Sequence, residues 1–222
     1  MKLPKEHIFQ KPGDDNCGPC CLAMVYSLKG KQVPRDLNLK LKKKGKTTYT
    51  PQLASYLLKN EIKPKLFISN PQVISPAWSN LPKEKIIKNL KSWLMINPKR
   101  GWKTFGRHLL TYLRNGGEIE LKSYTTEDFK KLLDKGSLLV LCLDEVWLWG
   151  HRFIKGKAKI DEIGGETHGH FVVVTKYNNG KFEIYDPYPT TVLGRFGVYW
   201  IDGNQLLNAS LIWASTILEV KK

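Results

Sequence analysis

The hydrophobic pattern of the chain changes from helical to strand-like at the Asn-Gly-Gly segment 115–117, and this change limits the fold more than any other feature. Before this segment, apolar residues recur at the three- and four-residue spacing of helices, most clearly at 17–30. After it, a continuous apolar run at 137–143 is typical of a buried strand, and 198–201 and 211–220 are expected to be closing strands. Helices first and strands second predict an α+β fold, with helices packed on a mostly antiparallel sheet.

Two strands in the last third of the chain are predicted to form a tight hairpin. Residues 170–177 (HFVVVTKY) and 181–185 (KFEIY) flank an Asn-Asn-Gly turn, whose residues accept the positive φ that such turns need. This pairing places Asp186 opposite about Val172, which is two residues from His170 on the same strand face, at a diagonal spacing of ~7–8 Å. The hairpin therefore predicts that His170 and Asp186 lie close together.

Length and composition are typical of one globular domain. The chain has 222 residues, of which 41% are hydrophobic and 25% are charged. No apolar run approaches the ~20 residues that span a bilayer, and residues 1–10 lack the apolar run of a secretory signal. We therefore expect a single cytoplasmic domain over 1–222 without a membrane span. It would carry a helical insertion at about 71–117 and a loop at about 144–167 that can act as a flap.

The chain is strongly basic, with 36 basic and 20 acidic residues and a formal charge of +16. Such an excess raises the affinity for acidic partners of any kind. The basic residues are scattered, apart from a lysine-rich run at 40–46 that is typical of a solvated surface. The charge therefore suits an acidic peptide or protein substrate and leaves nucleic acid open as a less favoured partner. The oligomeric state does not follow from the sequence.

Cys17 stands where the first helix should begin, and a cysteine at such a position can be a nucleophile. Asp15 or Asn16 can cap this helix. A thiol reacts as the thiolate, and both the start of a helix and a nearby imidazole favour that form. Proline is tolerated at Pro19, early in the helix, and we expect Gly18 to leave room for a substrate backbone.

The hairpin and the residues around Cys17 supply the other groups that such a nucleophile needs. His170 would act as the base, and Asp186 would hold its ring and set its tautomer. The backbone N–H of Cys17 would bind the oxyanion, with the Gln10 amide as a second donor. These roles predict cleavage of a peptide bond through an acyl-enzyme, without a cofactor and without a metal.

Three stretches of sequence carry these residues. They are Gln10 with Asp14-Asp15-Asn16-Cys17-Gly18-Pro19 and Leu22-Ala23-Met24, then His168-Gly169-His170-Phe171-Val172-Val173-Val174, and then Tyr185-Asp186-Pro187. Together they resemble the bacteriocin-processing (double-glycine) peptidases and their stand-alone relatives. The resemblance implies a papain-like fold with Cys17 as nucleophile, His170 as base, Asp186 as orienting residue and Gln10 in the oxyanion hole. A phosphate-binding Gly-x-x-x-x-Gly-Lys-Ser/Thr motif is absent, so we expect no transporter ATPase in this chain and do not carry over the double-glycine specificity.

The sequence leaves three other functions open. Acyl transfer to an amine, as in a ligase or transglutaminase-like enzyme, would use the same thioester. A non-catalytic binding module would use the basic surface and bind polyanions in a salt-dependent way. A zinc site would combine Cys17, Cys20 and Cys21 with His168 or His170. Against zinc, adjacent Cys20 and Cys21 point in different directions on a helix, and we expect both to pack in the interior.

Some side-chain assignments also have alternatives. His168 shares strand parity with His170, and the apolar run directly after His170 favours His170 as the base. Asp186, before Pro187, can also be interpreted as a turn residue. Cys142, in an apolar strand, is expected to lie in the core.

Several tryptophans lie in the regions that the resemblance does not cover. They are Trp78, Trp93, Trp102, Trp147 and Trp149. We expect them to pack in the core or within the insertion, with a substrate groove or a partner surface as the alternative.

Overall fold

The structure is a computed structural model and describes residues 3–11, 15–41, 47–97, 100–154, 159–189 and 195–221. Over these residues, seven strands form one sheet in the order β2-β1-β9-β3-β6-β7-β8. In chain order, the strands of this sheet are β1 (Pro64–Ile68), β2 (Glu118–Leu121), β3 (Ser137–Asp144), β6 (Gly169–Asn178), β7 (Lys181–Tyr185), β8 (Val198–Asp202) and β9 (Thr216–Lys221). Neighbouring strands are antiparallel, except β1 and β2, which are parallel.

The central strands β3 and β6 hold the middle of the sheet. All eight residues of β3 are buried, which explains why 137–143 is apolar without alternation. β3 pairs with β6 on one side and with β9 on the other. β6 pairs in turn with β7, and Tyr185 lies opposite Val173. This register follows the expected hairpin and carries Asp186 toward His170.

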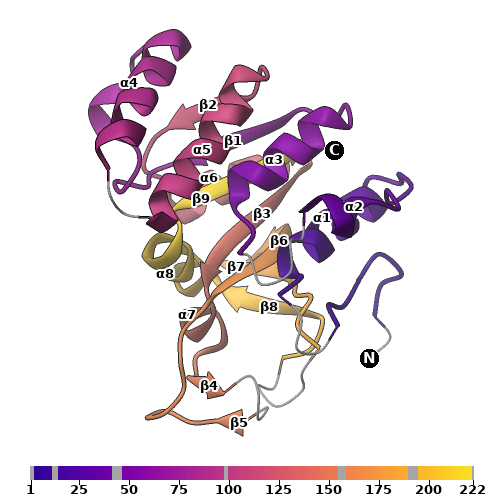
Figure 1. The fold of residues 1–222 in the computed structure, drawn as a ribbon. Coiled ribbons are helices and arrows are strands. Elements are labelled where there is room, and N and C mark those ends of the chain that lie inside the picture. Colours follow the sequence, from indigo (N-terminus) through magenta and orange to yellow (C-terminus); the bar gives the residue numbers. More distant parts are fainter. Residues whose placement is uncertain are drawn as a thin grey trace.

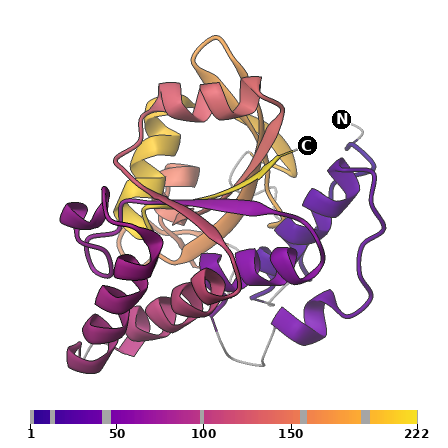
Figure 2. The ribbon, with the colours of Figure 1, turned by 90° about the horizontal axis from the view of Figure 1, so that it is seen from above.

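The helices form two layers, one on each face of the sheet (Figure 1). In chain order they are α1 (Cys17–Leu28), α2 (Leu37–Leu41), α3 (Thr50–Lys59), the 3-10 turn η1 (Pro76–Trp78), α4 (Lys83–Ile96), α5 (Arg100–Arg114), α6 (Thr126–Asp134), α7 (Glu145–Trp149) and α8 (Gly203–Trp213). Seen from above, α1, α3, α4 and α5 lie on one face and α6 and α8 on the other (Figure 2). A short ladder of β4 (Phe153–Ile154) and β5 (Lys159–Ile160) lies apart from the main sheet, at the bottom of Figure 1.

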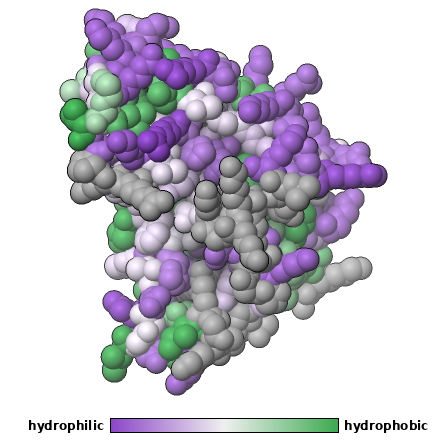
Figure 3. Space-filling view, viewed as in Figure 1, coloured by the Kyte–Doolittle hydropathy of each residue, from purple (hydrophilic) through white to green (hydrophobic). Residues whose placement is uncertain are grey.

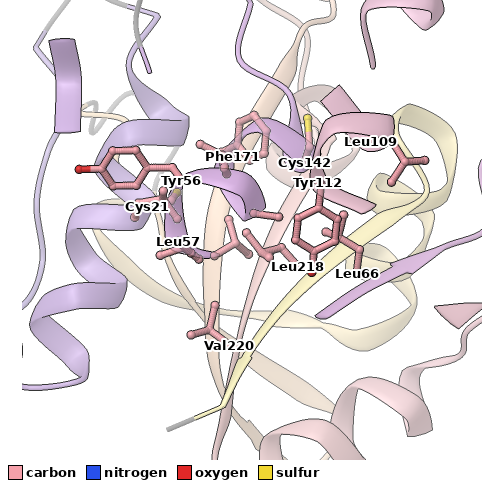
Figure 4. Close-up of a cluster of buried hydrophobic side chains, with 14 of the residues drawn as sticks. Cys21, Tyr56, Leu57, Leu66, Leu109, Tyr112, Cys142, Phe171, Leu218 and Val220 are labelled. Atoms are coloured by element: carbon pink, nitrogen blue, oxygen red, sulfur yellow. The ribbon is translucent and has the colours of Figure 1, made fainter. Parts of the chain in front are cut away.

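Each face of the sheet has its own hydrophobic core. The core under α1, α3 and α5 contains Leu57, Phe171 and Leu218 (Figure 4). The core on the opposite face contains Phe129 of α6 and Leu206 of α8. Because β3 and β6 send alternate side chains into the two cores, these strands are apolar on both faces.

α8 corrects the expected end of the chain. The sequence predicts a closing strand over 211–220, but α8 continues to Trp213 and only then does β9 begin. The Asp202 carboxylate caps α8 by accepting hydrogen bonds from the N–H groups of Asn204 and Gln205. The prediction is wrong for the first part of this run because the apolar last turn of a helix looks like a strand in sequence.

The segment 144–167, predicted as a loop, begins with a helix. The Asp144 carboxylate accepts a hydrogen bond from the Trp147 N–H at 3.0 Å and so caps α7. α7 turns Trp149 into the interior, where the residue is 3% exposed. The loop prediction is therefore wrong for α7 and for the paired strands β4 and β5, and the flap stays a prediction.

The predicted α+β class is confirmed, with α1 packed against a mostly antiparallel sheet. The expected insertion at 71–117 contains η1, α4 and α5, and α5 packs on α3. The assignment of 1–222 to a single domain stays a prediction. In the described part of the chain, no helix combines the length and apolar character that crossing a bilayer requires.

Candidate active site

Cys17 is the first residue of α1. Asn16 occupies the N-cap position, and its carbonyl accepts a hydrogen bond from the Cys20 N–H at 2.9 Å. The N–H groups at the start of a helix favour a nearby negative charge, so this position stabilises a thiolate. The Cys17 residue is half-buried and lines a cavity.

Gly18 allows the start of α1 to approach β6 closely. It is buried, and a Cβ added here would lie 3.1 Å from Thr48 Cγ2 and 3.4 Å from Phe171 Cδ2. These two residues fill the space that the missing side chain leaves. The expectation that Gly18 makes room for a substrate backbone is therefore wrong. Gly18 instead brings the helix of Cys17 near the strand of His170.

His170 and Asp186 form a buried hydrogen-bonded pair. His170 Nε2 lies 2.7 Å from Asp186 Oδ1, and the two residues are 1% and 3% exposed. An ionised carboxylate only accepts hydrogen bonds, so Nε2 carries the proton of this contact and Nδ1 is left for other partners. Cys17 forms a side-chain hydrogen bond with His170. The structure thus brings together three residues from distant parts of the sequence.

Further donors hold the Asp186 carboxylate. Trp149 Nε1 and Tyr199 OH donate to Oδ2 at 3.2 and 2.6 Å, and the Tyr188 N–H donates to Oδ1 at 2.8 Å. Burial raises the pKa of this carboxyl group, but the charge and hydrogen bond of His170 and the bonds from Tyr199 and Tyr188 lower it below its ordinary value. Asp186 is therefore ionised at neutral pH and fixed in orientation.

The surroundings of His170 keep its ring protonated. Burial lowers the pKa of His170, but the Asp186 carboxylate and the Cys17 sulfur outweigh burial and raise it to about 10. A protonated imidazole beside a sulfur stabilises the thiolate. This arrangement therefore favours a nucleophilic sulfur next to a group that can donate a proton.

Cys17 and His170 face a cavity of about 420 Å³. Its wall also includes Gln10, Thr48, His168 and Trp213. Gln10 is 6% exposed, and its backbone N–H donates to the Pro187 carbonyl at 2.8 Å. This bond ties the Gln10 segment to the residue after Asp186. The residues predicted from sequence therefore meet at one place, with Asp186 behind His170.

His168, the alternative base, lies on the wall of the same cavity. Its side chain is 44% exposed, and its Nε2 is 3.5 Å from Glu166, whose side chain is 79% exposed. The buried carboxylate of Asp186 is bonded to His170 instead. The geometry therefore favours His170 over His168 as the base.

The sequence did not indicate the three residues that hold Asp186. Trp149 is expected to pack in the core or insertion, and it does so while its indole N–H also reaches Asp186. Tyr188 had a local signal, because an aspartate side chain commonly accepts the N–H two residues later. Tyr199 lies opposite Ile184 in the β7–β8 pairing, and no local pattern reveals that contact.

The other cysteines are buried, with exposures of 8% for Cys20, 0% for Cys21 and 8% for Cys142. Burial raises the pKa of Cys21 and of Cys142, so both favour the thiol form. Cys142 belongs to the core, as expected, and also lines the cavity at Cys17. Over the described ranges, no group of three or more His, Cys, Asp or Glu side chains is arranged to hold a metal ion.

No protein-family model and no curated protein matches this chain. Among solved structures, the chain is similar to one described as a "putative C39-like peptidase from Bacillus anthracis". The two chains share 15% identical residues with a TM-score of 0.41, and the match covers 97% of this chain and 94% of the other. What this site can do therefore follows from its own residues.

Proposed function

We propose that this chain is a cysteine peptidase that cleaves a peptide bond with Cys17, His170 and Asp186. The observation that carries the proposal is a line of contacts, from the Asp186 carboxylate through the His170 ring to the Cys17 sulfur. This line ends at a helix start and beside a cavity. A carboxylate, an imidazole and a thiol in this order supply an orienting group, a base and a nucleophile.

In the first step, the Cys17 thiolate attacks the substrate carbonyl carbon. A C–S bond forms, and the electron pair of the C=O bond moves to the oxygen. The Cys17 backbone N–H and the Gln10 side-chain amide donate hydrogen bonds to this oxyanion. When the intermediate collapses, the C–N bond breaks and His170 gives its proton to the leaving amine. Cys17 is then a thioester and His170 is neutral.

In the second step, water clears the thioester. His170 takes a proton from the water as it attacks, and the C–S bond breaks to release the acid and the Cys17 thiolate. Asp186 stays ionised throughout and holds the ring in position. An amine in place of water would give acyl transfer, so the product depends on which nucleophile reaches the thioester.

Alkylation kinetics test the nucleophile. At about pH 7, iodoacetamide should label Cys17 faster than it labels glutathione, because the protonated His170 ring would keep Cys17 as the thiolate, and the thiolate is the form that reacts. His170→Asn should slow the labelling by at least about tenfold. His151→Asn, at an exposed histidine bonded to Glu162, is the matched control and should leave the rate unchanged. If Cys17 is labelled no faster than glutathione, Cys17 is not an activated nucleophile. If His168→Asn slows the labelling more than His170→Asn does, His168 is the base.

Cleavage is tested with a mixture of unstructured peptides. The wild-type protein should produce new peptide termini, detected by mass spectrometry, and Cys17→Ser should not. Added glycine amide would appear as an adduct on the new C-termini if the thioester is transferred to amines. Identical products from wild type and Cys17→Ser would rule out the peptidase.

A further inference from the structure

A second cavity, of about 480 Å³, adjoins the cavity at Cys17, and we call it the side pocket. Thr47, Thr48, Cys142 and Trp213 line both cavities. The side pocket therefore adjoins the cavity that Cys17 lines. A side chain bound in the side pocket can therefore belong to a peptide whose backbone lies in the cavity at Cys17.

The wall of the side pocket is apolar. Trp102 and Phe105 of α5 pack with ring centroids 6.2 Å apart at 71°, and Tyr49 packs on Phe105 at 6.5 Å and 80°. Ile212 and Trp213, at the end of α8, also line it. Among the described residues, no charged side chain belongs to this wall. Edge-to-face aromatic contacts fix the rings, so the side pocket is largely preformed.

Trp213 stands at the junction of the two cavities. A Cβ added at Gly169 would overlap its indole ring, so Trp213 packs directly on the residue before His170. Its side chain also forms a hydrogen bond with Cys142. A substrate residue that enters the side pocket past Trp213 therefore has its backbone near Cys17 and His170.

Some apolar side chains of α8 and α4 are exposed. Ile212 is 54% exposed, and Met95 and Ile96, at the end of α4, are 77% and 80% exposed. Figure 3 shows patches of hydrophobic surface among hydrophilic ones at the upper left, where α4 lies in Figure 1. Exposed apolar surface near a cavity is typical of a binding region.

We propose that the side pocket binds a large apolar side chain of the peptide substrate, such as that of Phe or Leu, close to the cleaved bond. The inference rests on the proposed function, because it places that bond at Cys17. The cavity volume falls within the range of ~300–1,000 Å³ that is usual for ligand sites. A charged side chain would lose its hydration there without gaining a charged partner among the described residues of the wall.

This assignment gives the expected insertion a role in specificity. Gly101, Trp102 and Phe105 line the side pocket and belong to α5, within 71–117. A double-glycine substrate has no side chain to fill this space. The side pocket therefore favours substrates that have an apolar residue near the cleaved bond.

Binding is measured first with Cys17→Ser protein, so that the result does not depend on turnover. The probes are acetyl-Ala-Phe-Ala-Ala-amide and its counterparts with Gly or Asp in place of Phe, titrated by NMR. We expect the Phe peptide to bind at least about tenfold tighter than the Gly peptide, and the Asp peptide to bind weakest. Ile212→Glu should remove this preference. Leu211→Glu, at a 40% exposed neighbour on the same helix, should retain it.

Turnover separates this inference from the peptidase proposal. The active protein should cleave the Phe peptide with a kcat/KM at least about tenfold above that of the Gly peptide. The Phe peptide can bind tighter than the Gly peptide while no peptide of the mixture described above is cleaved. This result would refute the peptidase function and support the side pocket as a binding site for apolar side chains. If the peptides bind equally, or are cleaved with equal kcat/KM, the side-pocket inference is wrong whatever the peptidase does.

Discussion

Replacing Asp186 by asparagine should destabilise the protein although the two side chains have the same shape. Trp149 Nε1 and Tyr199 OH both donate to Oδ2, while His170 Nε2 and the Tyr188 N–H both donate to Oδ1. An amide places an NH₂ group at one of these positions. The Tyr199 hydroxyl and a neutral His170 ring can turn or change tautomer to accept from it, but the N–H groups of Trp149 and Tyr188 only donate, so one of these two meets a donor in either orientation. A buried donor that lacks an acceptor costs about 1–3 kcal/mol, and we therefore expect a loss of about 1–3 kcal/mol in the free energy of unfolding.

The same geometry predicts a coupling between Asp186 and Tyr199. In the wild-type protein, Tyr199→Phe removes a donor to a charged acceptor and should cost about 1.5–3 kcal/mol. In the Asp186→Asn background the acceptor is no longer charged, so the same change removes a neutral hydrogen bond, which is worth only about 0.5–1.5 kcal/mol. The double variant should therefore be more stable than the sum of the two single losses predicts.

Urea unfolding at about pH 7, followed by circular dichroism, gives the four free energies of this cycle. Asp202→Asn is the matched control, because Asp202 caps α8 and asparagine is an equally good N-cap, so its effect should stay below about 0.5 kcal/mol. If Asp186→Asn also stays within about 1 kcal/mol of wild type, or if the double variant is additive, Asp186 is not the shared acceptor.

Two further predictions concern His170 and Gly169. The folded-state pKa of His170 is raised from 6.5 to about 10, so its protonated ring stabilises the fold fully below pH 6.5, and this stabilisation is lost as the pH rises through about 10. Urea unfolding should therefore show a larger loss between about pH 6 and pH 9.5 for wild type than for His170→Gln, and equal losses would contradict the raised pKa. Gly169→Ala should overlap Trp213 and lower the stability by about 1–3 kcal/mol in thermal or urea unfolding. Gly101→Ala should leave the stability unchanged, because no atom of the described residues lies within 4 Å of the added Cβ. Equal losses of stability for the two alanine variants would contradict the Trp213 contact.

Local patterns predicted the parts of the site that depend on residues near one another in sequence. The helix start at Cys17 was visible because capping residues and a proline cluster there. The hairpin turn was visible because it needs positive φ, and Asn179 and Gly180 adopt φ values of 46° and 79°. Its register then placed Asp186 beside His170 within one hairpin.

Long-range pairing set the parts that local patterns could not predict. β9, the last strand of the chain, lies between β1 and β3, and nothing near 216–221 specifies those neighbours. Tyr199 reaches Asp186 only through the pairing of β7 with β8. Trp102 and Trp213 line one pocket although α5 and α8 are far apart in sequence. Such contacts depend on which elements meet in space, and the spacing of residues along the chain does not indicate which elements meet.

Because the site depends on distant elements, the proposed reactivity would be confined to the folded protein. A buried, ionised Asp186 is costly unless its oxygens are well paired, and its donors come from α7, from β8 and from the hairpin. The raised pKa of His170 depends in turn on that carboxylate and on the Cys17 sulfur, which Gly18 allows to approach. The ion pair therefore forms only when α1, the hairpin and α7 are all packed. In the proposed peptidase, these elements would preorganise the chemistry before substrate arrives, and the side pocket, whose walls include residues of α5 and α8, would select the substrate.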